Sequence, residues 1–143
     1  MQYHLPQFFC HTIAMNLSRF FHHPQAAMVL LRVALAVLML FHGWAKITKG
    51  IGGVESLVIK AGLPGWVAYG VYLGEVVAPL LMLVGLWVVA AAVVMAVSML
   101  FALFLAHTGH FLSVSNSGGW ALELQAFFLV CSVVVAMGYS KGK

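Results

Sequence analysis

The stretch 66–86 reads WVAYGVYLGEVVAPLLMLVGL and contains one charged residue, Glu75. It is long enough to cross about 30 Å of hydrocarbon, which takes roughly 20 helical residues. A charged side chain near the middle of a bilayer costs about 2.5–3.5 kcal/mol on insertion scales, so it usually faces a partner, a cavity or a proton path. The stretch therefore predicts a membrane-spanning helix that carries a candidate functional residue.

Three other apolar runs accompany this stretch, at 28–49, 88–107 and 119–138. The chain of 143 residues is 64% hydrophobic and 7% charged, whereas a soluble domain carries about 25% charged residues. Backbone polar groups in lipid must be satisfied within helices or closed barrels. We therefore predict an all-α integral membrane protein, an up-down-up-down four-helix bundle.

The segments outside the spans indicate the organisation and orientation. Residues 1–27 form a polar tail, and 28–143 form the membrane domain. An even number of spans places both termini on one side, and the basic residues favour the cytoplasm for that side. These are Arg19, Arg32, Lys141 and Lys143 on the terminal side, against Lys46, Lys49 and Lys60 on the other.

Residues 50–65 connect the first two spans. Apolar residues recur there at helical spacing from Val54 to Ala61, before the helix-ending sequence GLPG at 62–65. This pattern predicts a short amphipathic helix that lies at the membrane interface.

The net charge and the cysteines give expectations about binding partners and disulfides. The net charge of +4 is spread over the tail, the loop after the first span and the C-terminus. This spread gives no basic patch for nucleic acid, and lipid phosphate is the expected counterpart. Cys10 lies in the tail and Cys131 lies deep in the fourth span, so we expect no disulfide between them.

Polar residues share one face on each of the first two spans. At 100° per residue, Arg32, His42 and Lys46 fall within an arc of about 100° on the first span. Tyr72 and Glu75 share a face of the second span. Because charged groups in a membrane bundle turn inward, we expect these faces to converge.

The charges within the spans sum to zero, with Arg32 and Lys46 against Glu75 and Glu123. At about 1.5 Å per residue, Glu75 lies near the midplane, with His42 and Glu123 roughly 6–8 Å toward the loop after the first span. Arg32 lies roughly 9 Å the other way and either extends toward Glu75 or turns to the interface. Lys46 is placed to hold Glu123. These pairs either serve chemistry or fix the register of the bundle.

Aromatic and histidine side chains near the span ends give further expectations. The four tryptophans fit an interfacial belt, with Trp44 as an exception and a candidate for ligand contact. His107 and His110 have i, i+3 spacing, but no cysteine or carboxylate accompanies them, so we expect no metal site. Haem b between His42 and His107 is disfavoured because their levels differ by roughly 7 Å.

The motifs follow a characteristic order along the chain: Leu31-Arg32, Gly43-Trp44-Ala45-Lys46, Gly62-Leu63-Pro64, Gly74-Glu75, Gly85 and a late Glu123. This order resembles the DoxX family of small bacterial membrane proteins, from about Arg32 to the end of the chain. Two positions depart from the family: Tyr139 replaces a usual second glycine, and Trp87-Val88 stand where a basic residue is usual. The resemblance implies a four-helix protein of the bacterial inner membrane. The resemblance also implies a relation to a subunit associated with thiosulfate:quinone oxidoreduction and to proteins linked to membrane oxidoreductase complexes.

The leading hypothesis is a component of a membrane oxidoreductase system that binds a quinone or another small redox partner. In this role Glu75 exchanges protons, His42 donates a hydrogen bond to a quinone oxygen, and Lys46 stabilises developing negative charge. Further candidates for ligand contact are Glu123, Arg32, Trp44, Tyr72 and His107.

The chain carries no dinucleotide fingerprint and no cluster-binding cysteine pattern, so any electron carrier comes from the lipid phase or from another subunit.

Two other function classes stay open. In a non-catalytic scaffold that binds another membrane protein, the charged residues would have a structural role. A proton-coupled transporter of small solutes would need a homo-oligomer, because four spans are few for a pathway.

Overall fold

The computed structural model describes residues 22–106, 114 and 118–140. These residues form an all-α bundle, which confirms the predicted fold class, and residues 22–106 and 118–140 contain no strand. The elements in chain order are α2 (Pro24–Lys49), α3 (Gly52–Lys60), the 3-10 helix η1 (Gly65–Gly70), the π-helix η2 (Leu73–Val77), α4 (Ala78–Val84), α5 (Val88–Ala106) and α6 (Glu123–Tyr139).

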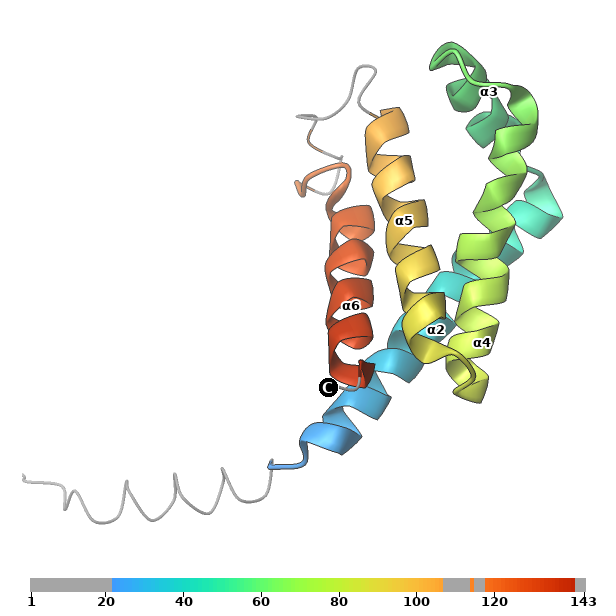
Figure 1. Cartoon of the computed structure of the whole chain (residues 1–143). Helices are drawn as coiled ribbons and strands as arrows, with labels where there is room; N and C mark the ends of the chain where they lie inside the picture. The colour runs from blue at the N-terminus through green and yellow to red at the C-terminus, as the bar shows by residue number, and fades with distance from the viewer. Residues whose placement is uncertain (1–21, 107–113, 115–117, 141–143) are drawn as a thin grey trace, which may run out of the picture.

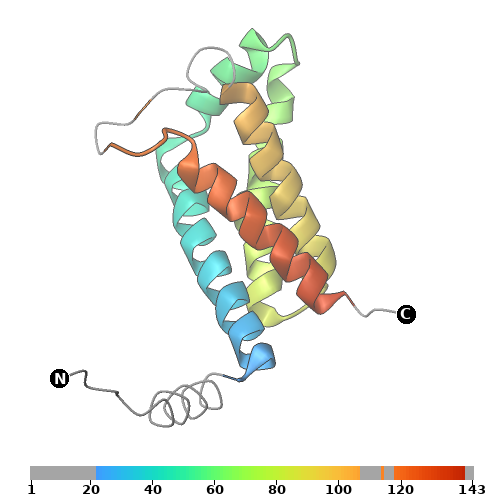
Figure 2. The same ribbon diagram turned by 90° about the vertical axis from the view of Figure 1, so that its left-hand side faces the viewer.

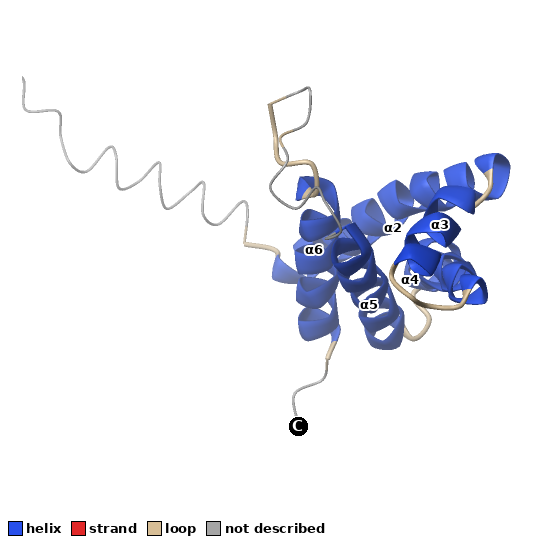
Figure 3. Ribbon diagram, turned by 90° about the horizontal axis from the view of Figure 1, so that it is seen from above, coloured by secondary structure: helices blue, strands red, loops and turns tan. Residues whose placement is uncertain are grey.

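The helices run up and down, and the first turns of α2 and the last turn of α6 lie at the end opposite α3 (Figure 1). The most extensive packing is between α5 and α6, and α2 packs against α4, η2 and α6. In Figure 2, α2 runs along one edge of the bundle and α6 crosses the face toward the viewer diagonally, in contact with both α2 and α5. Seen from above, α5 lies between α6 and α4 (Figure 3). The polar face of α2 is thereby directed toward η2 and α6.

Three helical segments of the described chain are long and apolar enough to cross a membrane: Pro24–Lys49, Gly65–Val84 and Val88–Leu105. The fourth apolar helix, α6, begins at Glu123, four residues after the predicted start at Gly119. The reason is a turn, because Gly118 has a left-handed φ of 86° and the Glu123 N–H donates to the Trp120 carbonyl. With 17 residues, α6 is at the lower limit for a spanning helix.

The helix predicted between the first two spans is confirmed as α3. Its Val58 is fully buried, against Ile51, Ala68 and Leu105. The helix ends before Gly62, whose φ of 79° favours glycine. Together with η1, α3 covers the end of the bundle opposite the first turns of α2 and the last turn of α6 (Figure 1).

The second span is not a regular α-helix. A 3-10 turn and a π-helical turn precede α4, and the Ala78 N–H donates to the Leu73 carbonyl, five residues back. Pro79 has no N–H and its ring would clash with the Glu75 carbonyl in an α-helix. The wider π turn relieves this clash, so the backbone around Glu75 is set by the proline that follows it.

The core contains many methionines, which fill the irregular space between the helices. Met39, Met82 and Met95 are the largest fully buried side chains, and they lie on α2, α4 and α5. Large apolar side chains also cover the outer faces, among them Leu30, Phe104 and Val130. An apolar surface of this kind fits contact with lipid.

Candidate functional site

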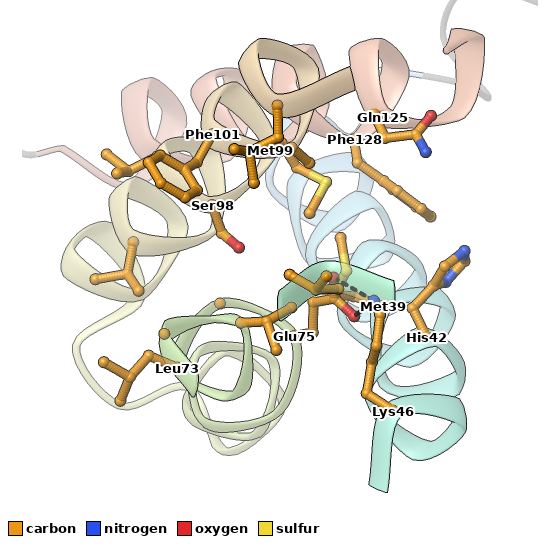
Figure 4. Close-up of a pocket in the computed structure, with 18 of the residues that line it drawn as sticks. Met39, His42, Lys46, Leu73, Glu75, Ser98, Met99, Phe101, Gln125 and Phe128 are labelled. Atoms are coloured by element: carbon orange, nitrogen blue, oxygen red, sulfur yellow. Dashed lines mark hydrogen bonds and ion pairs between the residues drawn. The ribbon is translucent and has the colours of Figure 1, made fainter. Parts of the chain in front are cut away.

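Lys46 and Glu75 form a close ion pair in the interior of the bundle. The Lys46 Nζ donates to Glu75 Oε1 at 3.0 Å and to Oε2 at 2.9 Å. The Glu75 side chain is 8% exposed and the Lys46 side chain 27%. Figure 4 shows Lys46 extending from α2 to the carboxylate on η2. The midplane carboxylate predicted from the sequence therefore has a cation as its partner.

Two glycines allow the chain to place Glu75 at this point. A Cβ on Gly43 of α2 would collide with the backbone carbonyl of Glu75. A Cβ on Gly74 would collide with the side chain of Ser98 on α5. Small residues permit such close approach between membrane helices. The π turn that carries Glu75 is therefore clamped between α2 and α5.

A cavity of about 550 Å³ lies beside the ion pair. Its polar wall is formed by His42, Lys46, Glu75, Ser98 and Gln125, and the rest is apolar. The Ser98 hydroxyl points from α5 into the space next to the pair (Figure 4). The Oε1 atom of Gln125 is buried and has no hydrogen-bond partner. Ligand sites in proteins combine an apolar lining with a few polar groups in this manner.

His42 is fixed by two contacts in the cavity wall. Its Nδ1 lies 3.0 Å from the Leu38 carbonyl oxygen, and because that oxygen only accepts, Nδ1 carries the proton. The ring packs edge-on against Phe128 with 5.4 Å between the ring centroids. In the neutral ring Nε2 is then an acceptor, and it donates only when the ring is protonated.

The sequence matches one protein-family model over much of its length. The family described as DoxX matches residues 27–108, which is more than half of the chain. The chain belongs to the DoxX family. The matched DoxX segment contains Lys46 and Glu75, whereas Gln125 and Phe128 of the cavity lie beyond it. Neither the search of curated proteins nor the search of solved structures found a match.

Within this DoxX protein, Glu123 is not the partner of Lys46. Lys46 pairs with Glu75, and the exposed Glu123 side chain makes no ion pair within the described chain. Its carboxylate instead lies against Gly119, as a Cβ there would be 2.8 Å from Oε1. The turn before α6 thus directs Glu123 along the chain rather than toward α2.

Arg32 also departs from the expected convergence. It lies over the ring of Tyr139 and beside Gly85, at the end of the bundle opposite α3. The residues that line the cavity do not include it. Of the two orientations considered for Arg32, the structure shows the one that turns away from Glu75.

Two other predicted contact residues, Tyr72 and Trp44, fall outside the cavity. The Tyr72 hydroxyl donates to the backbone carbonyl of Lys46 at 3.4 Å, so it supports the helix that carries the lysine. Trp44 is 65% exposed and lines a separate apolar groove of about 500 Å³ between α2 and Val76. His107 lies outside the described residues.

Sequence reasoning missed Ser98, Gln125 and Phe128, which complete the cavity of the DoxX protein. Ser98 is a single polar residue in the apolar run of α5, and Gln125 follows Glu123 by two positions. Polar residues within spans are a signal for an interior face. In the described residues there is no group of three histidine, cysteine or acidic side chains placed to hold a metal.

Proposed function

We propose that this DoxX-family protein is a component of a membrane oxidoreductase system and that its cavity binds a quinone-like ligand. The observation that carries the proposal is the partly buried Lys46–Glu75 pair in the wall of a mainly apolar cavity. By the family resemblance and the charge bias, we place the protein in the bacterial inner membrane with both termini in the cytoplasm.

The size and lining of the cavity support a lipid-soluble ligand. Its volume of about 550 Å³ falls in the range of about 300–1,000 Å³ that small-molecule sites occupy. Leu73, Val93 and Val97 line the cavity and are also exposed on the outer surface of the bundle. A ligand dissolved in the bilayer therefore has a route to the ion pair between apolar side chains.

The polar groups match the chemistry of a quinone. Reduction of a quinone takes up two electrons and two protons, and the electrons would come from another subunit. The Lys46 ammonium is placed to stabilise negative charge on a quinone oxygen. Glu75 can pass a proton to that oxygen, and His42 can do so when its ring is protonated. In the reverse direction, the neutral His42 Nε2 accepts a hydrogen bond from a quinol hydroxyl.

A non-catalytic scaffold is the second candidate, and a specific observation favours it. Both carboxylate oxygens of Glu75 are already bound by Lys46. A closed ion pair of this kind can fix the register of a bundle without chemistry. In this case the cavity would be a packing defect, and no quinone would occupy it.

Filling the cavity separates the two candidates. Ala102 on α5 lines the cavity, so Ala102→Phe would occupy the space next to the ion pair. We expect the affinity for a short-chain ubiquinone, titrated into the purified protein in nanodiscs, to fall by at least about tenfold. The control is Ala90→Phe on the exposed face of the same helix, which should bind like wild type. A wild-type protein that does not bind the quinone would favour the scaffold.

His42 offers a test of one hydrogen bond. His42→Phe keeps an aromatic ring against Phe128 but removes the Nε2 atom. We expect the quinol form to bind about fivefold more weakly, which corresponds to about 1 kcal/mol for a single hydrogen bond. The same titration with Thr48→Val, a change at an exposed residue further along α2, should show no loss. Equal quinol affinity for wild type and His42→Phe would remove His42 from the proposed site.

A further inference from the structure

Arg32 lies where three elements meet, at the end of the bundle opposite α3. Its Cζ atom is 5.3 Å from the centroid of the Tyr139 ring on α6. Its Nη1 atom lies beside the turn between α4 and α5, since a Cβ on Gly85 would be 3.1 Å away. The guanidinium is therefore held between two segments far apart in the sequence, and outside the cavity proposed for the quinone.

Apart from the Tyr139 ring, the charge of Arg32 has no counterpart in the described chain, and no carboxylate pairs with it there. Its Nε atom is buried without a hydrogen-bond partner, and so is the hydroxyl of Tyr139. The interior carboxylate, Glu75, is occupied by Lys46. Neither a hydrogen bond nor an ion pair links Arg32 to any described residue. Because an unpaired cation in a membrane protein is costly, the arrangement indicates an anion that the described residues do not supply.

The depth of Arg32 in the membrane indicates which kind of anion it can meet. α4 ends at Val84, the next residue Gly85 has a left-handed conformation, and Trp87 in the same turn is 72% exposed. Tryptophan and tyrosine side chains are enriched where a membrane meets water. Trp87 and Tyr139 therefore mark this end of the bundle as the interface, where phospholipid phosphates lie. A guanidinium presents a planar fork of N–H donors that matches phosphate oxygens.

We propose that Arg32, positioned by Tyr139 and the Gly85 turn, binds the phosphodiester group of an anionic phospholipid at the terminal side of the membrane. The ring contact holds the guanidinium plane, which leaves its donor edge for the phosphate. The site is distinct from the Lys46–Glu75 cavity and does not depend on the quinone proposal. Inorganic phosphate carries the same oxygens, so the test distinguishes a lipid from a free anion.

The test measures lipid binding to the full chain by native mass spectrometry after mild detergent extraction. The probes are dioleoylphosphatidylglycerol, dioleoylphosphatidylcholine and inorganic phosphate. We expect wild type to retain phosphatidylglycerol in preference to phosphatidylcholine, and Arg32→Gln to lower the apparent affinity for phosphatidylglycerol by at least about tenfold. Lys49→Gln removes the same charge at the other end of α2 and should change this affinity by less than about twofold.

Three results would overturn the proposal. Equal retention of both lipids by wild type would show that no anionic site exists, and this measurement needs no variant to fold. Unchanged binding of phosphatidylglycerol by Arg32→Gln would show that the lipid binds elsewhere. If inorganic phosphate displaces phosphatidylglycerol at equal concentration, the site takes a free anion and the lipid assignment is wrong.

Discussion

Replacing Glu75 by glutamine is expected to abolish the retention of a quinone and to lower the free energy of unfolding by about 3–5 kcal/mol. The substitution keeps the shape of the side chain but removes its charge, so the Lys46 amino group loses its charged partner in a largely buried position. Thermal unfolding in detergent measures the stability loss. Quantification of quinone in gently purified protein measures the ligand.

A double-mutant cycle with Lys46→Met and Glu75→Met separates stability from chemistry. Each single change leaves one charge unpaired, whereas the double variant removes both charges. We therefore expect the double variant to be more stable, by about 0.5–3 kcal/mol, than the sum of the two single stability losses predicts. If the double variant is stable but binds no quinone, the pair takes part in ligand binding. If the double variant binds quinone like wild type, the pair only fixes the register of the bundle. If the stability losses of the two single variants are additive, no ion pair forms in the membrane.

The sequence predicted the helices well because a continuous apolar run of about 20 residues crosses lipid as a helix. The start of α2 lies four residues before the expected Met28, and α5 begins at the expected Val88. Glu75 was identified because a charge inside such a run is costly. These predictions depend on composition over many residues, which small local irregularities do not change.

The pairing of the charges was harder to predict. Helical periodicity gives the angle of a side chain around its own helix but not the rotation of one helix against another. Arg32 and Lys46 share a face of α2, yet they are 46 − 32 = 14 residues apart, which is about 21 Å along the helix. They therefore serve opposite ends of the bundle. The π turn at Leu73–Val77 also departs from the regular spacing used to place Glu75.

The glycines that clamp Glu75 illustrate a second limit. Gly43 and Gly74 are adjacent to His42 and Glu75 in the sequence. Nothing in the sequence of one helix shows that a neighbouring backbone comes close to a glycine, because that contact depends on the packing of several helices. The missing Cβ is informative only when the partner backbone is known.

Substituting Gly43 by alanine is expected to lower the free energy of unfolding by about 1–3 kcal/mol, the usual cost of overpacking. It should also weaken quinone binding, because α2 has to move away from η2 and this movement separates Lys46 from Glu75. Thermal unfolding and the ubiquinone titration measure both effects. Gly53→Ala on α3 is the matched control, since nothing lies within 4 Å of a Cβ there. It should be neutral or stabilising by up to about 1 kcal/mol.

A rescue experiment tests whether this loss comes from the backbone contact. The new methyl group at Gly43 would meet the Glu75 carbonyl, which no side-chain substitution removes, so Val76→Ala should not restore stability to Gly43→Ala. Gly74→Ala differs, because its methyl group would meet only the side chain of Ser98 at close range, with the Ser98 Cα at 3.7 Å. Ser98→Gly should therefore rescue Gly74→Ala. If Val76→Ala fully restores the stability of Gly43→Ala, close backbone approach does not hold α2 and η2 together. The position of Glu75 would then have to be assigned to side-chain packing.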